Sequence, residues 1–337
     1  MRAKLFLFII LIASILSACG LGGKAATPTA APTITPTPLP TLTPTPVVPL
    51  AILVLPADMN KAESDAFQKV VYDLAQQENM HFQVRNSLTP ADLEPGLKVV
   101  IALPPDPGVA ALAAAAPQVQ FLAVDIPGIT AGGNISVMAA TTHPDIPAFI
   151  AGYTAAMISD DYHTGILIPK DNVDGQKAAA AFSNGMAYYC GLCRPFYFLP
   201  YSFPQVVEIP STEDKAHYGA YADILIVQHK VYTIYLYPDI AVKELTDYLG
   251  TTGTQVIGTV LPDSKPSGWV MTIRPDEIKA IQAAWPDLIA GKGGQNVQAP
   301  LGLADVDPTL LSPGKQRLVQ QVLDDLQSGR ISTGIGQ

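Results

Sequence analysis

Short apolar runs alternate with helical stretches through most of the chain. Residues 50–56, LAILVLP, have the length of a buried strand, and in the stretch that follows Ala66, Val70, Val71 and Leu74 fall on one helical face. The same pattern predicts further strands at 81–86, 97–103, 119–125, 135–140, 163–169, 203–210, 222–228, 254–260 and 268–273, and helices at 106–116, 147–159, 174–189, 240–249, 275–285 and 313–329. Strands that alternate with helices of this length are typical of βαβ units, which form parallel sheets.

The predicted strands are more than one doubly wound sheet usually holds. We therefore expect an α/β protein of two Rossmann-like lobes, whose parallel sheets surround a ligand cleft as in type I periplasmic binding proteins. The expected limits are 50–160 plus 262–292 for the first lobe and 161–258 plus 295–335 for the second.

The N-terminus has the pattern of a secretory signal. Arg2 and Lys4 are followed by an apolar stretch at 5–16. Twelve helical residues rise only about 18 Å, which is too short for a bilayer core of about 30 Å. The sequence LSAC that follows resembles the bacterial lipobox. This resemblance implies that residues 1–18 are removed as a signal peptide and that Cys19 carries lipid, which would anchor the protein to the extracytoplasmic face of the cell membrane.

Residues 19–49 are expected to form a lipidated linker. Its part at 27–49 is an almost continuous Thr/Pro ladder, and proline fixes φ and lacks an N–H donor. Such a segment is extended polyproline II, about 3.1 Å per residue, and forms a semi-rigid spacer of roughly 60–70 Å.

Composition narrows the function classes. The chain of 337 residues has a formal net charge of −9, and no basic run offers a footprint for nucleic acid. The five histidines show no metal-ligand spacing, and no nucleophile motif such as G-x-S-x-G is present. We therefore expect no enzyme activity, no catalytic residue, no cofactor and no metal site.

The middle of the chain resembles the basic membrane protein (BMP) family, which are lipoprotein solute-binding components of ABC transporters, often for nucleosides. The helix match rests on AFIAGYTAAM, in which Phe149, Gly152 and Tyr153 correspond to the family pattern, and the next match on Phe182 and Gly185. The resemblance covers most of 50–335 and rests chiefly on this block. It implies an extracytoplasmic, lipid-anchored protein that captures a small polar ligand for an ABC importer, a nucleoside being one candidate.

The resemblance also indicates ligand-binding residues. PADMNKAES keeps Asp58 and Asn60 of the family's nucleoside motif but lacks its stacking phenylalanine, and Asp125 keeps its place at the end of a strand. Asp263 is the carboxylate nearest to the family's ribose-binding aspartate, and Arg274 stands in place of its lysine. For Asp58 and Asp125 turn or capping chemistry is the structural alternative, and Asn60 could equally cap the following helix.

Two more ligand-binding candidates come from the pattern itself. Trp269 could stack on a ligand near the cleft, and Asp174 lies at a helix start on the second lobe, where it could also act as the cap.

The pair Cys190 and Cys193 in CGLC leaves a second hypothesis. A C-x-x-C motif can be a thiol oxidoreductase site, yet this one follows a predicted helix, whose C-terminus does not favour a thiolate. Outside the cytoplasm we expect a disulfide. A third hypothesis keeps the fold and makes the protein a diverged sensory or accessory lipoprotein. The expected partners are thus a small solute, an ABC permease and, through the lipid, the membrane.

Overall fold

The computed structural model describes residues 47–139, 144–193, 202–260, 262 and 265–336. The predicted signal peptide at 1–18, the predicted lipidation site Cys19, nearly all of the predicted linker at 19–49 and the candidate Asp263 lie outside these residues.

The first sheet has six strands in the order β11-β5-β4-β3-β1-β2, and every pair in it is parallel. The strands are β1 (Leu50–Val54), β2 (His81–Arg85), β3 (Leu97–Ala102), β4 (Gln120–Val124), β5 (Ile135–Ala139) and β11 (Asn296–Gln298). All residues of β1 and β4 are buried, as expected for the inner strands of a sheet that is covered on both faces.

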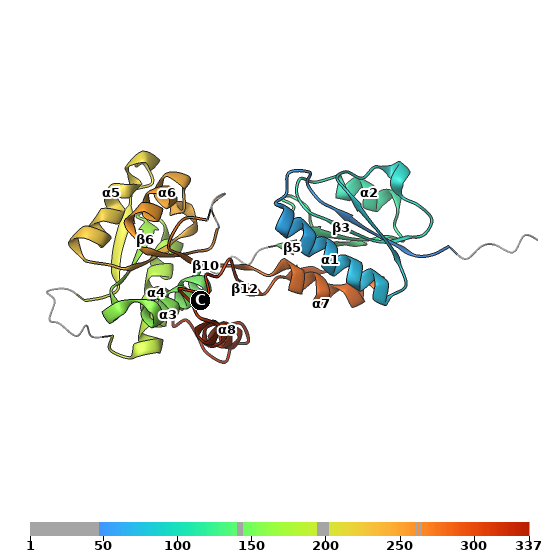
Figure 1. The fold of residues 1–337 in the computed structure, drawn as a ribbon. Coiled ribbons are helices and arrows are strands. Elements are labelled where there is room, and N and C mark those ends of the chain that lie inside the picture. The colour runs from blue at the N-terminus through green and yellow to red at the C-terminus, as the bar shows by residue number, and fades with distance from the viewer. Residues whose placement is uncertain (1–46, 140–143, 194–201, 261, 263–264, 337) are drawn as a thin grey trace, which may run out of the picture. The chain divides into compact units, whose positions relative to one another are not determined.

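Helices cover both faces of the first sheet (Figure 1). Helices α1 (Lys61–Gln77) and α7 (Glu277–Ile289) pack together on one face, and α2 (Val109–Ala115) covers the other. Phe67, Val71 and Ala75 are the buried residues of α1. Their spacing of four residues places them on one side of a helix. Of the face expected from the sequence only Val71 is among them, and Ala66, Val70 and Leu74 lie beside it and are partly buried.

The second sheet also has six strands, in the order β12-β10-β9-β8-β6-β7. They are β6 (Thr164–Pro169), β7 (Gln205–Ile209), β8 (Thr233–Leu236), β9 (Gln255–Gly258), β10 (Trp269–Pro275) and β12 (Leu301–Ala304). The pairs are parallel except β10 with β12, which is antiparallel. The fold class expected from the sequence, two α/β lobes with largely parallel sheets, is therefore confirmed.

Two groups of helices accompany the second sheet (Figure 1). One group is α3 (Asp145–Ile158), α4 (Val173–Cys190) and α8 (Pro313–Gln327), and the other is α5 (Tyr218–Asp223) and α6 (Lys243–Thr252). Short helical turns complete the chain: η1 (Pro90–Asp92), η2 (Asp160–Tyr162), η3 (Lys215–His217), the π-helix η4 (Ile224–Gln228) and η5 (Pro238–Ile240). The second sheet and its two groups of helices surround one continuous hydrophobic core.

Two glycines allow α3 and α4 to cross with their backbones in contact. A Cβ atom at Gly152 would lie 2.0 Å from the carbonyl oxygen of Phe182, and one at Gly185 would lie 2.0 Å from that of Phe149. The glycines of AFIAGYTAAM and its partner segment thus serve helix packing, which is why that block is so regular in the sequence.

Both sheets share one winding order. Counted along the chain, β1 to β5 follow the order 2-1-3-4-5, and β6 to β10 repeat it. In such sheets the second strand is added on one side of the first, and the third strand is added on its other side. The connections therefore leave the first and third strands in opposite directions, and a crevice forms at their carboxyl ends. Each lobe therefore has its own switch point, at β1/β3 in the first sheet and at β6/β8 in the second.

The observed sheets differ from the expected lobe limits. Strand β10, which we placed in the first lobe, pairs in the second sheet, and β11, placed in the second lobe, pairs in the first. Helix α3, also expected in the first lobe, packs on α4 in the core of the second. The reason is that the apolar pattern of one strand does not show to which sheet the strand belongs. That is decided by the strands with which it forms hydrogen bonds.

The predicted strand at 222–228 is wrong. This stretch continues α5 into the π-helix η4. Its buried residues Tyr218, Ala222 and Leu225 are spaced by four and three, which is a helical period. The apolar run ILIV concealed this spacing, because a short continuous apolar run fits a strand equally well.

Candidate functional site

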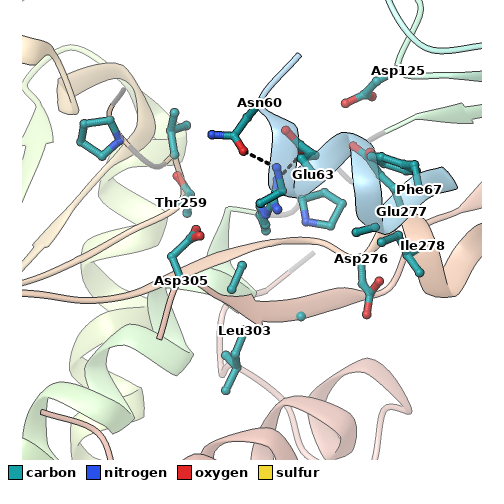
Figure 2. Close-up of a pocket in the computed structure, with 18 of the residues that line it drawn as sticks. Asn60, Glu63, Phe67, Asp125, Thr259, Asp276, Glu277, Ile278, Leu303 and Asp305 are labelled. Carbon is teal, nitrogen blue, oxygen red and sulfur yellow. Dashed lines mark hydrogen bonds and ion pairs between the residues drawn. The ribbon is translucent and has the colours of Figure 1, made fainter. Parts of the chain in front are cut away.

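A cavity of about 1100 Å³ is lined by residues that follow β1 and β4 of the first sheet, by the starts of α1 and α7, and by residues of β10, β12 and the loop after β9 of the second sheet (Figure 2). Four residues predicted from the sequence line it together: Asp58, Asn60, Asp125 and Arg274. Five further polar residues line it that the sequence interpretation did not select: Glu63, Thr259, Asp276, Glu277 and Asp305.

Asp58 and Asn60 reach the cavity because β1 ends directly before them and α1 begins directly after. Asn60 is the N-cap of α1, and its Oδ1 accepts a hydrogen bond of 2.9 Å from the backbone N–H of Ala62 (Figure 2). Capping satisfies a donor that the first helical turn leaves open. Both alternatives for Asn60 therefore apply at once: the side chain caps the helix and lines the cavity.

Asp125 follows β4, and its backbone is left-handed, with φ at 51°. Its N–H donates to the carbonyl of Met138 at 2.8 Å, which holds the turn in place. Asp305, which also lines the cavity, has the same conformation with φ at 52°. Aspartate tolerates this conformation better than most residues, and such backbone strain gathers at functional sites.

Arg274 does not face the cavity as an unengaged cation. Its Nη1 donates to Oε1 of Glu63 at 3.1 Å, and both side chains are partly exposed. This ion pair joins the end of β10 to the first turn of α1. An exposed pair of this kind contributes little to stability, up to about 1 kcal/mol, but it neutralises the guanidinium locally.

Glu277 has the most perturbed carboxyl group of the cavity. It is the first residue of α7, behind the N-cap Asp276, whose Oδ1 accepts from the N–H of Lys279 at 2.9 Å. Burial, and then repulsion by Asp125, raise the pKa of Glu277 from 4.5 to about 7, while the charge of Arg274 acts in the opposite direction. At neutral pH this carboxyl group therefore exists in both its protonated and its ionised form.

The charge of the cavity is strongly one-sided. Among the described lining residues a single guanidinium stands against six carboxyl groups, which are Asp58, Glu63, Asp125, Asp276, Glu277 and Asp305. Sequence reasoning could have found two of the missed carboxyl groups, because Asp276 and Glu277 lie within three residues of Arg274 at a predicted helix start. Glu63 and Asp305 gave no signal, since surface acids of this kind occur in every exposed helix turn or loop.

One hydroxyl group at the cavity has no hydrogen-bond partner. Thr259 follows β9, and its Oγ1 is closed to solvent yet makes no hydrogen bond within the described part of the chain. Native proteins leave few such groups unpaired, and because this oxygen is closed to solvent, a solute in the cavity could bind it only if the surrounding side chains moved.

Trp269 is not a cavity residue. Its side chain is fully buried, and its Nε1–H donates to Oγ1 of Thr272 at 3.1 Å. The ring packs on Gly258, where a Cβ atom would lie 2.6 Å from Cη2. A tryptophan that is buried on all sides, with its one donor satisfied, has no surface left for a ligand, so the prediction for Trp269 is wrong.

Asp174 is neither the helix cap nor part of the larger cavity. Asn172 is the N-cap of α4, and its Oδ1 accepts from the N–H groups of Asp174 and Gly175 at 2.9 and 3.0 Å. The exposed carboxylate of Asp174 instead pairs with Lys177 at 3.0 Å.

A second, smaller cavity of about 300 Å³ lies beside Asn172. It sits at the carboxyl ends of β6, β7 and β8, which is the switch point of the second sheet. Its lining residues are Pro169, Asp171, Asn172, Ile209, Ser211, Tyr218, Asp239 and Ile240. Strand ends of both sheets thus line polar cavities, and the smaller cavity lies at a switch point.

Three other expectations bear on the chemistry. Cys190 and Cys193 form a disulfide, as expected, at the C-terminal end of α4. Within the described ranges no three His, Cys, Asp or Glu side chains are grouped so that they could hold a metal ion. A search of the same residues for a helix with the length and apolar character of a membrane span finds none.

No known family profile and no curated protein sequence matches the chain. Solved structures similar to it include an ABC transporter solute-binding protein from Aeropyrum pernix K1, with 13% identity over 85% of this chain and 93% of the other and a TM-score of 0.45. A transcriptional activator of the comK gene from Bacillus halodurans has 14% identity over 85% and 99%, with a TM-score of 0.46. A LacI family regulator from Enterococcus faecium with bound ribose has 13% identity over 76% and 97%, with a TM-score of 0.38. At these scores the likenesses carry no argument about what this chain binds.

Proposed function

We propose that this protein is an extracytoplasmic solute-binding lipoprotein that captures a small polar solute and presents it to an ABC importer. The observation that carries the proposal is the repeated architecture: two doubly wound sheets whose strand ends line polar cavities. The BMP family, which the block AFIAGYTAAM resembles, is the family we propose for it.

The larger cavity has properties that suit a solute. Its volume, about 1100 Å³, slightly exceeds the usual range for ligand pockets, roughly 300 to 1,000 Å³. The buried Oγ1 of Thr259 lacks a partner, and the left-handed backbones of Asp125 and Asp305 meet in its lining. Perturbed carboxyl groups such as Glu277 also concentrate at functional sites.

Membrane attachment is part of the proposal. The lipobox-like LSAC and the Thr/Pro ladder at 27–49 support a mature chain that begins at a lipidated Cys19. A tethered binding protein would sample solutes outside the membrane and still reach a permease beside its anchor. Closure around the solute would give the permease a distinct surface to recognise.

We propose binding without catalysis. The thiol oxidoreductase alternative would use Cys190 and Cys193, but these are joined at a helix C-terminus, where the dipole disfavours the thiolate that such an enzyme needs. The nucleoside alternative would use an aromatic side chain for stacking on the base. Phe67 is the one aromatic residue in the described cavity lining, and it is 3% exposed.

Thermal unfolding of the full chain against a panel of solutes tests the proposal. The panel contains nucleosides, sugars, amino acids and amines, each as its own sample. A solute present at a hundredfold excess over its Kd stabilises the folded state by about 2.7 kcal/mol, which raises the midpoint by several degrees. A hit should lose this stabilisation in Asp58→Ala, whereas Asp73→Ala, on the exposed side of α1 and paired with Lys69, should keep it.

The outcomes separate the hypotheses. If no solute raises the unfolding midpoint, the proposed function is wrong. If a solute binds but deletion of the protein leaves its uptake unchanged, the importer role fails, and a sensory or accessory lipoprotein becomes the better description.

A further inference from the structure

The smaller cavity, at the switch point of the second sheet, has a chemistry of its own. Its polar groups come from the loop after β6, from the loop after β7 and from η5 after β8. The sequence interpretation assigned only Asp174 to this region, and Asp174 does not line the cavity.

Tyr218 supplies a buried polar group that points to a ligand. The residue is 6% exposed and lines the cavity at the start of α5. Its hydroxyl makes no hydrogen bond within the described part of the chain, and the oxygen is not closed off from solvent. The hydroxyl of this buried ring is therefore open to solvent and is not used by the described residues, so a ligand in the cavity can bind it.

The start of α4 is not an anion site, although it lies beside the cavity. The Oδ1 of Asn172 accepts from the first available N–H groups, at 2.9 and 3.0 Å. Its Nδ2 donates to Oδ2 of Asp239 at 3.2 Å. Asp174 in the first turn further offsets the positive end of the helix dipole. The helix N-terminus is thus already satisfied by the protein.

The charged groups that remain for a ligand are carboxylates, and the neutral ones are hydroxyls, which can accept or donate a hydrogen bond. The carboxylates of Asp171 and Asp239 and the hydroxyl oxygens of Ser211 and Tyr218 line the cavity, and no Lys or Arg does so among the described residues. Pro169, Ile209 and Ile240 add apolar wall. Carboxylates beside an aromatic ring and aliphatic walls suit a compact cation with several donors.

The larger cavity has the same sign of charge. Its six carboxyl groups face one guanidinium, and that guanidinium is paired with Glu63. A neutral, hydroxyl-rich solute could form hydrogen bonds in either cavity. It would not neutralise the excess negative charge of the carboxylates in either one. A solute with an ammonium or guanidinium group balances it.

We infer that the smaller cavity is a subsite for the ammonium group of an organic amine, held by Asp239 and the hydroxyl of Tyr218. This inference rests on the proposed solute-binding function and narrows its substrate class from polar solutes to cationic ones. Donor groups on the amine would complete the open acceptors of Tyr218 and Asp239, and its alkyl part would lie on Ile209 and Ile240.

Calorimetric titration of the full chain in neutral detergent, at low ionic strength, tests the inference with matched pairs of solutes. The pairs are arginine with citrulline, choline with 3,3-dimethyl-1-butanol, and 1,4-diaminobutane with 1,4-butanediol. In each pair the shape is similar and the charge differs. We expect at least one amine to bind tenfold or more tightly than its neutral partner, because hydrogen bonds to charged groups contribute roughly 1.5 to 3 kcal/mol.

Two variants then locate the amine. Asp239→Asn removes the charge at constant size, and Tyr218→Phe removes the hydroxyl alone; each should weaken the amine about tenfold and leave the neutral partner unchanged. Asp247→Asn, on the exposed surface of α6 where its side chain pairs with Lys243, is the control and should bind as the unaltered chain does. Unfolding midpoints of all variants show that the fold is intact, and if one variant fails to fold the other still decides.

Each outcome has a distinct meaning. Neutral partners that bind as tightly as the amines overturn the cationic class, while the solute-binding function stands. Amine binding that is unchanged in both Asp239→Asn and Tyr218→Phe overturns the assignment to the smaller cavity. Absence of binding by every solute, in this panel and in the wider one, overturns the proposed function and this inference together.

Discussion

Glu277 gives the sharpest quantitative prediction, because its ionisation connects the larger cavity with the stability of the fold. Burial and repulsion by Asp125 raise its pKa from 4.5 to about 7 in the folded protein. In the unfolded chain the same group is surrounded by water and returns to its ordinary value. Folding therefore takes up a proton at this residue between pH 4.5 and 7.

The sign of the effect follows from this difference. Below pH 4.5 the group is protonated in both states and contributes nothing. Between pH 4.5 and 7 the carboxyl group ionises in the unfolded chain but stays largely protonated in the folded protein. Ionisation therefore stabilises the unfolded chain, and the free energy of unfolding falls as the pH rises. A shift from 4.5 to about 7 corresponds to about 3 kcal/mol. The side chain is only half-buried, and water screens part of the interaction, so we expect a loss of about 1 to 2 kcal/mol.

Urea unfolding of residues 47–337, a compact unit by itself, measures this loss at pH 5 and at pH 8. Glu277→Gln keeps the size of the side chain and cannot ionise. At pH 8 it should be more stable than the unaltered chain by about 1 to 2 kcal/mol, and at pH 5 the two should be nearly equal. Glu244→Gln is the matched control, because Glu244 is also in the first turn of its helix but is exposed and outside the described cavities.

Two results would refute the reasoning. If Glu277→Gln and Glu244→Gln change the pH dependence equally, the effect belongs to helix starts in general and not to the cavity. If Glu277→Gln lowers stability at pH 8, the carboxylate makes favourable contacts that outweigh its burial and its repulsion by Asp125.

Three further predictions concern packing and the disulfide. Gly152→Ala should lower the free energy of unfolding by about 3 kcal/mol or more, because its Cβ would lie 2.0 Å from the carbonyl oxygen of Phe182. Gly132→Ala is the control: no atom lies within 4 Å of the new Cβ, so urea titration should show no change in stability. Gly258→Ala should cost about 1 to 3 kcal/mol through its contact with the ring of Trp269, and a companion change in tryptophan fluorescence would show that the ring has moved. Replacing Cys190 and Cys193 together by alanine should cost about 2 kcal/mol, since the disulfide closes a very short loop; thiol titration of the unreduced chain should find neither cysteine, and two reactive thiols would contradict the pairing.

The local spacing of apolar residues predicted most helices and strands of the fold. It did not predict which strands pair with one another. The apolar runs of β1, β4 and β6 and the one-sided helix α1 could be recognised because their buried positions follow one regular spacing. Strands β11 and β12 were missed, since segments of three and four residues carry too few positions to show a period. The sheet to which β10 belongs depends on β9 and β12, which no spacing within β10 reveals.

The candidate site was predictable where a residue follows a strand end in the chain. Asp58 and Asp125 were found on this ground, and both line the larger cavity. Trp269 was selected for its chemistry alone, and burial removed it. The subsite residues Tyr218 and Asp239 could not be found, because the stretch after Tyr218 resembled a strand and Asp239 lies in a short helical turn. They meet only through the folding of the second sheet.

The structure also changes what the predicted residues can offer a solute. Asn60 uses its oxygen to cap α1, and Arg274 uses its charge on Glu63, so the one guanidinium of the described lining that could recognise an anion is already engaged by the scaffold. Carboxyl groups are what the cavity has left in excess, and the raised pKa of Glu277 shows how strongly they and burial oppose one more negative charge. A nucleoside would leave this opposition in place, because its hydroxyls carry no charge. A cation would relieve it, and this is why the electrostatics of both cavities favour an amine over the nucleoside that the family resemblance alone implies.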